Sequence, residues 1–391
     1  MRLLLAAFCA LTMIAAPAVA EPTRSFAGEA RLLVDRDEAW ETIMGLVAGA
    51  KRSIAVDYYV LGGPRAIELA RELARRHREG LAVRVMLDPD LGTLPALKAL
   101  TTPVLHILRD AGVPVRLYPR DVLARKHGYR FVEDHNKVVV ADGQAAFVGS
   151  MNVGADILHN HDVGVRVEGQ VANAIGGEIA RAFVLATPMG HEELRPWPAA
   201  DLPTRLGSDE IAYFPTGLAG RHGRPAVLKA LAEAKEAVRV MMFELEDPDA
   251  EAALLAAHRR GVDVRVLVDP NDLTNLSPLG WAPRGVFNLG VASRLAAAGV
   301  AVRWYRPAAD EHALHAKAAL VDNTLLVGST NWNFFSFDLN NETMLAIGGG
   351  EAPRRFAQVF DADWADRSDP VSERPSASRL LLYRGLAFLL N

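Results

Sequence analysis

The stretch HNKVVVAD at residues 135–142 returns as HAKAALVD at residues 315–322, and this pair decides the fold. Each copy is followed by Gly-Ser-x-Asn, at residues 149–152 and 328–331, and then by a carboxylate. In both copies the lysine lies two residues after the histidine, the aspartate seven and the distal carboxylate 27. Repetition at this spacing indicates two related halves of one site. The matched residues are His135, Lys137, Asp142, Gly149, Ser150, Asn152 and Asp162 in the first copy, and His315, Lys317, Asp322, Gly328, Ser329, Asn331 and Glu342 in the second.

The sequence around the two copies repeats as well. Residues 73–89 match residues 254–270, and residues 111–118 match residues 298–305, at offsets of 181 and 187. Strand and helix patterns alternate in each half, which is typical of parallel strands covered by helices. We therefore predict an α/β protein made of two fused, repeat-related α/β lobes with central, largely parallel mixed sheets. In the first half the expected elements are strands at 31–34, 53–60 and 81–89 and helices at 37–50 and 65–79.

Changes in composition place the boundaries between these parts. A proline-rich connection, residues 187–207, separates the two lobes. The Leu-rich end of the tail suits a helix that either docks on the protein or lies on a membrane surface, and docking is favoured. The predicted parts are a signal peptide at 1–20, an N-terminal lobe at 21–186, the linker at 187–207, a C-terminal lobe at 208–370 and a tail at 371–391.

The first twenty residues predict export. Arg2 is followed by an apolar run and then by Ala18-Val19-Ala20, which is the layout of a secretory signal. A permanent membrane anchor is the weaker alternative, because the run is short for a bilayer span. The only cysteine, Cys9, lies in this segment, so the mature chain would have no cysteine chemistry. We expect a periplasmic or secreted protein, with association to a membrane as a further option.

Composition narrows the choice of partner. The chain has 391 residues, of which 50% are hydrophobic and 23% charged, so it can bury a large core. Its formal charge is −4, and this becomes −5 if Arg2 is removed with the leader. Proteins that grip nucleic acid through phosphates usually carry a basic excess or stripe. The sequence shows neither, so nucleic acid is the less favoured partner.

The residue types in the repeated motif suit work on a phosphate ester. Residues two apart on a strand share a face, so His135 and Lys137 are presented together. A neutral imidazole can attack or move a proton near neutral pH, and an ammonium beside it can hold anionic oxygens. The carboxylate of Asp162 or Glu342 could accept a hydrogen bond from the ring nitrogen that does not react. Neutral hydrogen-bond donors for the phosphate oxygens are expected from Ser150, Asn152, Ser329 and Asn331, while Asp142, Asp322, Gly149 and Gly328 are expected to be structural.

His-x-Lys-x4-Asp, present twice with Gly-Ser-x-Asn after each copy, resembles the phospholipase D superfamily over essentially the whole mature chain. Residues 315–342 are most similar to its bacterial cardiolipin synthase and phospholipase D-like branch. The resemblance implies that the halves meet about a pseudo-two-fold axis, with the active site at their interface. It also implies that one chain holds both half-sites, which makes a monomer sufficient.

The resemblance further implies roles for the two histidines. His135, the N-terminal one, would attack phosphorus to form a phosphohistidine, and His315 would protonate the leaving alcohol and activate the incoming one. The opposite assignment stays open from the sequence. No metal or other cofactor is implied. Asp162 stands where a glutamate is more usual, which bears on whether it reaches His135.

We therefore expect an enzyme that cleaves or exchanges the head group of a phospholipid at a membrane surface. Aromatic residues near the second motif, within 332–337, either contact this substrate or pack in the core. A secreted nuclease of the same superfamily is the alternative, and a non-catalytic lipid- or anion-binding module is a weaker one. The run His159-Asn160-His161-Asp162 can be drawn as a metal cluster, but a polar rim beside the site is the simpler interpretation.

Overall fold

The computed structural model describes residues 25–89, 95–120, 132–154, 159–198, 207–271 and 285–390. The side chains at 95–97, 384 and 386–390 are not described. The predicted signal peptide and Cys9 lie outside these residues.

The N-terminal lobe alternates strands and helices and then ends in three consecutive strands, a helix and a short strand. Its elements are β1 (Ser25–Val34), α1 (Asp35–Gly49), β2 (Ser53–Tyr58), α2 (Gly63–Arg78), β3 (Ala82–Leu87), α3 (Pro95–Asp110), β4 (Val115–Leu117), β5 (Lys137–Ala141), β6 (Ala145–Gly149), β7 (Val163–Gly169), α5 (Gln170–Leu185) and β8 (Thr187–Pro188).

The C-terminal lobe repeats this order. Its elements are β9 (Asp209–Gly217), β10 (Gly220–Arg221), α6 (Gly223–Glu233), β11 (Ala237–Met242), α7 (Pro248–Arg259), β12 (Asp263–Val268), α8 (Leu289–Ala297), β13 (Ala301–Tyr305), β14 (Lys317–Val321), β15 (Thr324–Gly328), α9 (Phe334–Asp338), β16 (Glu342–Gly348), α10 (Glu351–Asp366), β17 (Ser368–Pro370) and α11 (Ala377–Leu390).

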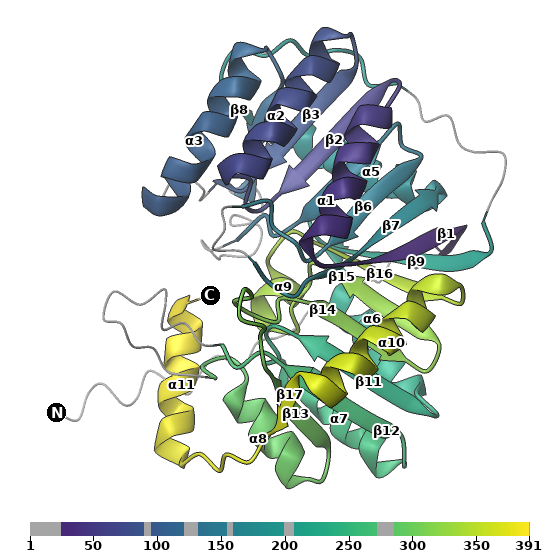
Figure 1. The fold of residues 1–391 in the computed structure, drawn as a ribbon, viewed down its shortest axis with the longest axis vertical. Helices are drawn as coiled ribbons and strands as arrows, with labels where there is room; N and C mark the ends of the chain where they lie inside the picture. Colours follow the sequence, from purple (N-terminus) through teal and green to yellow (C-terminus); the bar gives the residue numbers. More distant parts are fainter. Residues whose placement is uncertain are drawn as a thin grey trace.

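Strand pairing joins the two lobes and follows the repeat. From its outer edge inward, the N-terminal lobe pairs β8, β4, β3, β2, β5, β6, β7 and β1 in that order. The C-terminal lobe pairs β17, β13, β12, β11, β14, β15, β16 and β9 in the matching order. β1 then pairs antiparallel with β9, so backbone hydrogen bonds continue from one lobe into the other. Figure 1 shows β1 and β9 side by side where the lobes meet.

The strands are less parallel than the sequence pattern predicts. Among the strands of the described residues, only β2–β3–β4 and β11–β12–β13 pair in parallel, and the other pairings between neighbouring strands are antiparallel. The motif strands explain the difference, because β5–β6 and β14–β15 are joined by tight turns that require antiparallel neighbours.

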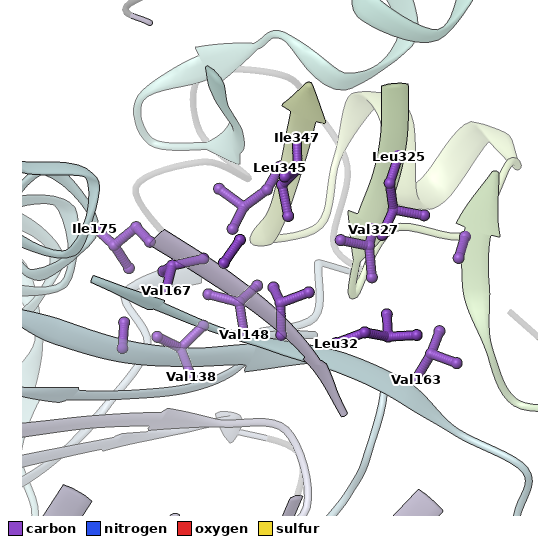
Figure 2. Close-up of a cluster of buried hydrophobic side chains, with 14 of the residues drawn as sticks. Leu32, Val138, Val148, Val163, Val167, Ile175, Leu325, Val327, Leu345 and Ile347 are labelled. Carbon is purple, nitrogen blue, oxygen red and sulfur yellow. The ribbon is translucent and has the colours of Figure 1, made fainter. Parts of the chain in front are cut away.

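Three apolar clusters hold the structure together. One lies under α1, α2 and α3 in the N-terminal lobe, and a second lies under α6, α7 and α8 in the C-terminal lobe. The third is shared, and Figure 2 shows Val138, Val148 and Val167 of one lobe facing Leu325 and Leu345 of the other. The two halves are therefore held together in two ways. They bury apolar surface in this shared core, and their backbones are hydrogen-bonded through β1 and β9.

The first part of the segment between the lobes, residues 187–193, is packed on the N-terminal lobe. β8 pairs with β4, and the backbone nitrogen of Glu193 donates to the carbonyl of Gly112 at 3.0 Å. At the other end of the chain, α11 packs near α8 through the buried ring of Tyr383. Leu381 and Leu382 on the same helix are 72% and 60% exposed.

The motif aspartates Asp142 and Asp322 lie in the hairpin turns after β5 and β14. Asp142 accepts hydrogen bonds from the backbone nitrogens of residues 51, 52 and 53 at 2.7–2.9 Å, and Asp322 accepts from those of residues 235, 236 and 237 at 2.8–3.0 Å. Both have positive φ, 56° and 50°, which aspartate and asparagine tolerate better than most residues. Each carboxylate thus fixes the start of β2 or β11 to a motif hairpin.

Replacing Asp322 by alanine should lower the free energy of unfolding by about 2 kcal/mol, because three backbone donors lose a charged acceptor. Urea denaturation followed by circular dichroism measures this loss. Asp322→Asn keeps one oxygen acceptor and the tolerance for positive φ, and should lose clearly less. Equal denaturation midpoints for the wild type and both variants would contradict this structural role.

Candidate active site

The two motif histidines lie two residues before the start of β5 and β14, where each half contacts the opposite lobe. The backbone nitrogen of His135 donates to the carbonyl of Asn341 at 3.0 Å, and that of His315 donates to the carbonyl of His161 at 2.8 Å. Parallel bridges connect Asp134 with Asn341 and His161 with Leu314. The residues that precede each distal carboxylate therefore lie beside the histidine of the other half.

This crossing pairs each histidine with the carboxylate of the other repeat. Nδ1 of His135 lies 2.9 Å from Oε1 of Glu342, and Nδ1 of His315 lies 2.8 Å from Oδ1 of Asp162. Asp162 was considered above as a partner of His135, and the structure corrects this. The backbone bridges carry Asp162 to His315 instead, at ordinary hydrogen-bond length despite its short side chain.

Ser150 and Ser329 do not present their hydroxyl groups to a phosphate, contrary to the prediction. The Ser150 hydroxyl donates to Oδ1 of Asp162 at 2.6 Å, and the Ser329 hydroxyl donates to Glu342. Both serines are buried. The reason is that each serine follows a strand paired with β7 or β16, and the carboxylate lies at the start of that partner strand: Asp162 directly precedes β7 and Glu342 begins β16. The two serines position the carboxylates.

The motif lysines are buried and held in equivalent positions. Nζ of Lys137 donates to the carbonyl of His135 at 2.7 Å, and Nζ of Lys317 donates to that of His315 at 2.6 Å. Each Nζ lies 4.9 Å from the centre of an aromatic ring, Tyr59 for Lys137 and Phe243 for Lys317. Burial lowers the pKa of Lys137 to about 8 and that of Lys317 to about 7. The charged form of a lysine this poorly solvated is stabilised when an anion is placed beside it.

The two asparagines of Gly-Ser-x-Asn have side chains that the protein does not fully satisfy. The Oδ1 atoms of Asn152 and Asn331 are buried and have no hydrogen-bond partner among the described residues. Unsatisfied amide groups of this kind are uncommon in protein interiors and concentrate at functional sites. Their predicted contact with phosphate oxygens stays a prediction.

Both histidines are set up as neutral bases. Burial lowers the pKa of His135 well below its usual value, and the charges of Lys137 and Lys317 lower it further. Burial and Lys317 lower the pKa of His315 to about 4. Where Nδ1–H is donated to an ionised carboxylate, Nε2 of the same ring carries the lone pair that can attack or accept a proton.

The two carboxylates are in different electrostatic states. Burial raises the pKa of Glu342 to about 8. Burial has the same effect on Asp162, but the charge and hydrogen bond of His315, together with Lys317, outweigh it and lower its pKa. The His315 half-site therefore contains the more firmly ionised carboxylate.

Several residues of the site escaped the sequence analysis. Tyr59 and Phe243 lie edge-on to His135 and His315, each with ring centres 5.0 Å apart. They occupy equivalent places, one residue after β2 and β11, so the repeat could have revealed them. The Tyr59 hydroxyl donates to Glu133 at 3.0 Å, and burial raises the pKa of Glu133 to about 7.

A buried acid pair, Asp57 and Asp134, supports the crossing near His135. The Asn341 amide donates to Asp134 at 2.7 Å and to Asp57 at 3.3 Å, and Asn136 donates to Asp57 at 3.0 Å. Burial raises the pKa of both carboxyl groups. Asp57 lies in the mostly apolar strand β2, and a carboxylate in such a strand is a sign in the sequence of a buried polar role. Its hydrogen bonds with Asn136 and Asn341 are that role.

The histidines at 159 and 161 are held by neighbouring side chains. His161 is buried, with one ring nitrogen on Asp35 at 2.7 Å and the other on Asp363 at 2.9 Å. His159 contacts Arg36 and the carbonyl of Asp310. Ligand atoms of Asp35, His161 and Glu311 lie within 4.8 Å of one another, so these residues could hold a metal ion. A metal would have to displace a carboxylate from His161.

The aromatic residues near the second motif differ in how deeply they are buried. Trp332 and Phe337 are buried in the C-terminal core. Phe334 and Phe335 are only half-buried and pack against the shared core.

No helix in the described part of the chain has the length and apolar character needed to cross a membrane.

Comparisons with known proteins point to one family. The family model described as "Cardiolipin synthase, PLD-like domain" matches residues 43–183 and 227–364. The chain is 28% identical over 374 residues to cardiolipin synthase A of Escherichia fergusonii, which covers 90% of this chain and 72% of that protein. Cardiolipin synthase A of Salmonella arizonae gives the same identity and coverage.

Solved structures share the fold at low sequence identity. The phosphatidylserine synthase of Haemophilus influenzae superposes with a TM-score of 0.69 at 13% identity, over 93% of this chain and 95% of that one. The polyphosphate kinase of Porphyromonas gingivalis superposes with a TM-score of 0.56 at 12% identity, over 92% of this chain and 55% of that one. The first of these structures shares the arrangement of two repeat-related α/β lobes over nearly its whole length.

Proposed function

The chain belongs to the cardiolipin synthase, phospholipase D-like domain family, and from this premise we propose that it cleaves or transfers the phosphatidyl group of a phospholipid. One observation carries the proposal. Two neutral histidines are each anchored by a buried carboxylate of the opposite half, and a buried lysine accompanies each of them. This is a site for double displacement at a phosphodiester, in which one imidazole attacks and the other moves protons.

In the first step Nε2 of His135 attacks phosphorus, a P–N bond forms, and the bond from phosphorus to the head-group oxygen breaks. His315 gives that oxygen a proton, so the head group leaves as a neutral alcohol. His315 must be protonated at this point, whereas its pKa in the free protein is about 4. The anionic phosphate and the ionised Asp162 both favour the imidazolium form, so bound substrate should raise this pKa.

In the second step His315 takes a proton from water or from an acceptor alcohol, whose oxygen attacks phosphorus as the P–N bond breaks. Water gives hydrolysis and a lipid alcohol gives transfer, through the same covalent intermediate. Lys137 and Lys317 balance the charge of the phosphoryl oxygens in both steps, and Asn152 and Asn331 are proposed to donate to them. None of these steps requires a metal ion.

A phospholipid is proposed over a nucleic acid for two reasons. The relatives in the comparison are named for lipid synthesis, and the formal charge of −4 gives no general attraction to a polyanion.

We also propose contact with a membrane surface through α11, where Leu381 and Leu382 are exposed. Export through the leader at residues 1–20 would bring the enzyme to such a surface, and N-terminal sequencing of the mature protein should then begin at Glu21.

The function is tested with purified mature protein and phosphatidylglycerol vesicles, with lipid products read by mass spectrometry. Released head group with phosphatidic acid indicates hydrolysis, and cardiolipin indicates transfer. The His135→Ala/His315→Ala double variant is the control and should be inactive. Degradation of single-stranded DNA in EDTA with intact vesicles would replace the lipid assignment by a nuclease, and equal lipid turnover by the double variant would exclude this site.

Membrane contact predicts a selective effect at α11. Leu381→Glu/Leu382→Glu places charge on the exposed face, so vesicle binding in a flotation assay should fall about tenfold. Turnover of a short-chain, water-soluble phosphatidylglycerol should stay within about twofold, because both residues are exposed and lie outside the catalytic set. Unchanged flotation would show that α11 does not contact the membrane.

The lysine pKa values predict how activity depends on pH. Lys137 and Lys317 lose their charge in the free protein as pH rises through about 7 to 8. Because the ammonium form binds the phosphodiester, kcat/KM should fall over this range. Steady-state kinetics at constant ionic strength measures the profile. Lys317→Arg keeps a cation at all these pH values and should remove the lower part of the fall. A profile that is flat between about pH 6 and pH 9 would contradict a role for lysine charge.

A further inference from the structure

The residue whose backbone is hydrogen-bonded to each catalytic histidine differs between the two halves. At His135 the neighbouring segment is Asn341, a neutral amide that donates to Asp134 and Asp57. At His315 the corresponding segment is His161, whose backbone nitrogen donates to Ala313 at 2.8 Å and whose carbonyl accepts from His315 at 2.8 Å. Both residues lie 26 positions after a motif histidine, so they are equivalent in the repeat. An ionisable ring thus replaces an amide at only one of the crossings.

The His161 ring ties the two lobes together. It is 3% exposed, with Nδ1 on Asp35 at the start of α1 and Nε2 on Asp363 of α10. Its face stacks on Tyr305 of the C-terminal lobe, with ring centres 5.4 Å apart and planes 7° apart. Burial opposes protonation of His161, but the hydrogen bonds and charges of both aspartates outweigh it and raise its pKa to about 10.

The same cluster holds the backbone of Asp162. The backbone nitrogen of Asp35 donates to the carbonyl of Asp162 at 2.8 Å, and the backbone nitrogen of Asp162 lies 3.3 Å from Oδ1 of Asp35. Asp35 has a φ of 59°, an unusual conformation that its neighbours must stabilise. Asp162 is therefore fixed on one side by Asp35 and at its side chain by Ser150, with Oδ1 directed at His315.

We propose that His161 is a positioning residue that, through Asp35 and Asp363, sets Asp162 against His315 and so governs proton transfer to the leaving alcohol. The inference rests on the proposed function, in which His315 is the acid and base. It assigns His161 no contact with substrate. A small shift of Asp162 weakens the Nδ1 hydrogen bond that stabilises the His315 imidazolium, while the attack by His135 keeps its own support at Glu342.

Two substrates that differ only in the leaving group separate this role from a general loss of structure. Phosphatidylglycerol releases glycerol and needs protonation by His315, whereas phosphatidyl-p-nitrophenol releases a stable anion and does not. For His161→Gln, release of glycerol should slow about tenfold relative to wild type, in line with a partial loss of general acid catalysis. The pre-steady-state burst of p-nitrophenol should stay within about twofold.

Asp363→Asn is the second variant, since it removes only the charge on the α10 side and tests the idea if His161→Gln folds poorly. It should show the same selectivity with a smaller loss. Asn341→Ala is the matched control at the other crossing. Because it supports Glu342 and His135, it should slow both substrates equally. Thermal unfolding of each variant is followed in parallel.

Equal slowing of both substrates by His161→Gln and Asp363→Asn would overturn the proposal, and so would full activity of both variants on phosphatidylglycerol. Failure of the proposed function looks different, because the wild-type protein would then turn over neither lipid.

Discussion

Replacing His135 by alanine should reduce phosphatidylglycerol turnover by at least about 10³-fold, because the attacking nitrogen and the covalent intermediate are lost together. The side chain is nearly enclosed, and its Nδ1 is held by Glu342. The loss should be similar in water and in the presence of glycerol, since hydrolysis and transfer share the intermediate.

The measurement is recovery of the phosphoenzyme. Wild-type protein mixed with ³²P-labelled phosphatidyl-p-nitrophenol and quenched in base should retain label in an acid-labile form, as expected for phosphohistidine. His315→Ala should also become labelled, because this leaving group needs no acid, and should then lose the label slowly. His135→Ala should retain none. A full yield of phosphoenzyme in His135→Ala would exchange the roles of the two histidines.

The crossed carboxylates give the second large effect. Asp162→Asn should behave as a partial loss of His315, and Glu342→Gln as a partial loss of His135, each lowering turnover by about 10²-fold or more. Both amides can keep the hydrogen bond but cannot stabilise an imidazolium. The sequence repeat alone would pair Asp162 with His135, because both belong to the first copy of the motif. The structure pairs Asp162 with His315, so the expected effects are exchanged between the two histidines.

Rapid-quench kinetics with phosphatidyl-p-nitrophenol resolves the two halves of the reaction. Asp162→Asn should form the phosphoenzyme at nearly the wild-type rate and break it down slowly, whereas Glu342→Gln should form it slowly. Ser150→Ala and Ser329→Ala, which remove only the hydroxyl donors to these carboxylates, should reproduce each pattern with a smaller loss. A pattern that follows the sequence repeat would contradict the crossed pairing.

Motif spacing predicts the composition of this site well and its connections poorly. His135, Lys137 and their counterparts could be found because chemistry restricts both their type and their spacing. The partner of each carboxylate depends on how segments 153 or 207 residues apart in the sequence pass each other, and no local pattern encodes this. Ser150 illustrates the limit, because its hydroxyl suits either a phosphate or a carboxylate and only the strand pairing decides between them.

The same reasoning applies to the fold. Two α/β lobes with a mixed sheet follow from alternating strand and helix patterns, and this prediction is confirmed. The proportion of parallel pairing was overestimated, because short apolar strands look alike in either orientation. The β1–β9 pairing could not be foreseen, since β9 lies just beyond the predicted linker and its partner lies at the other end of the N-terminal lobe.

The β1–β9 pairing also makes the chain a natural candidate for a split enzyme. A cut between Pro198 and Gly207 gives two fragments, each with one histidine motif and one exposed strand edge, β1 or β9. Neither fragment holds a histidine together with its carboxylate, because Glu342 serves His135 and Asp162 serves His315. Any turnover from mixed fragments would therefore require the two pieces to rejoin along that edge, so the crossed site acts as a built-in reporter of fragment assembly.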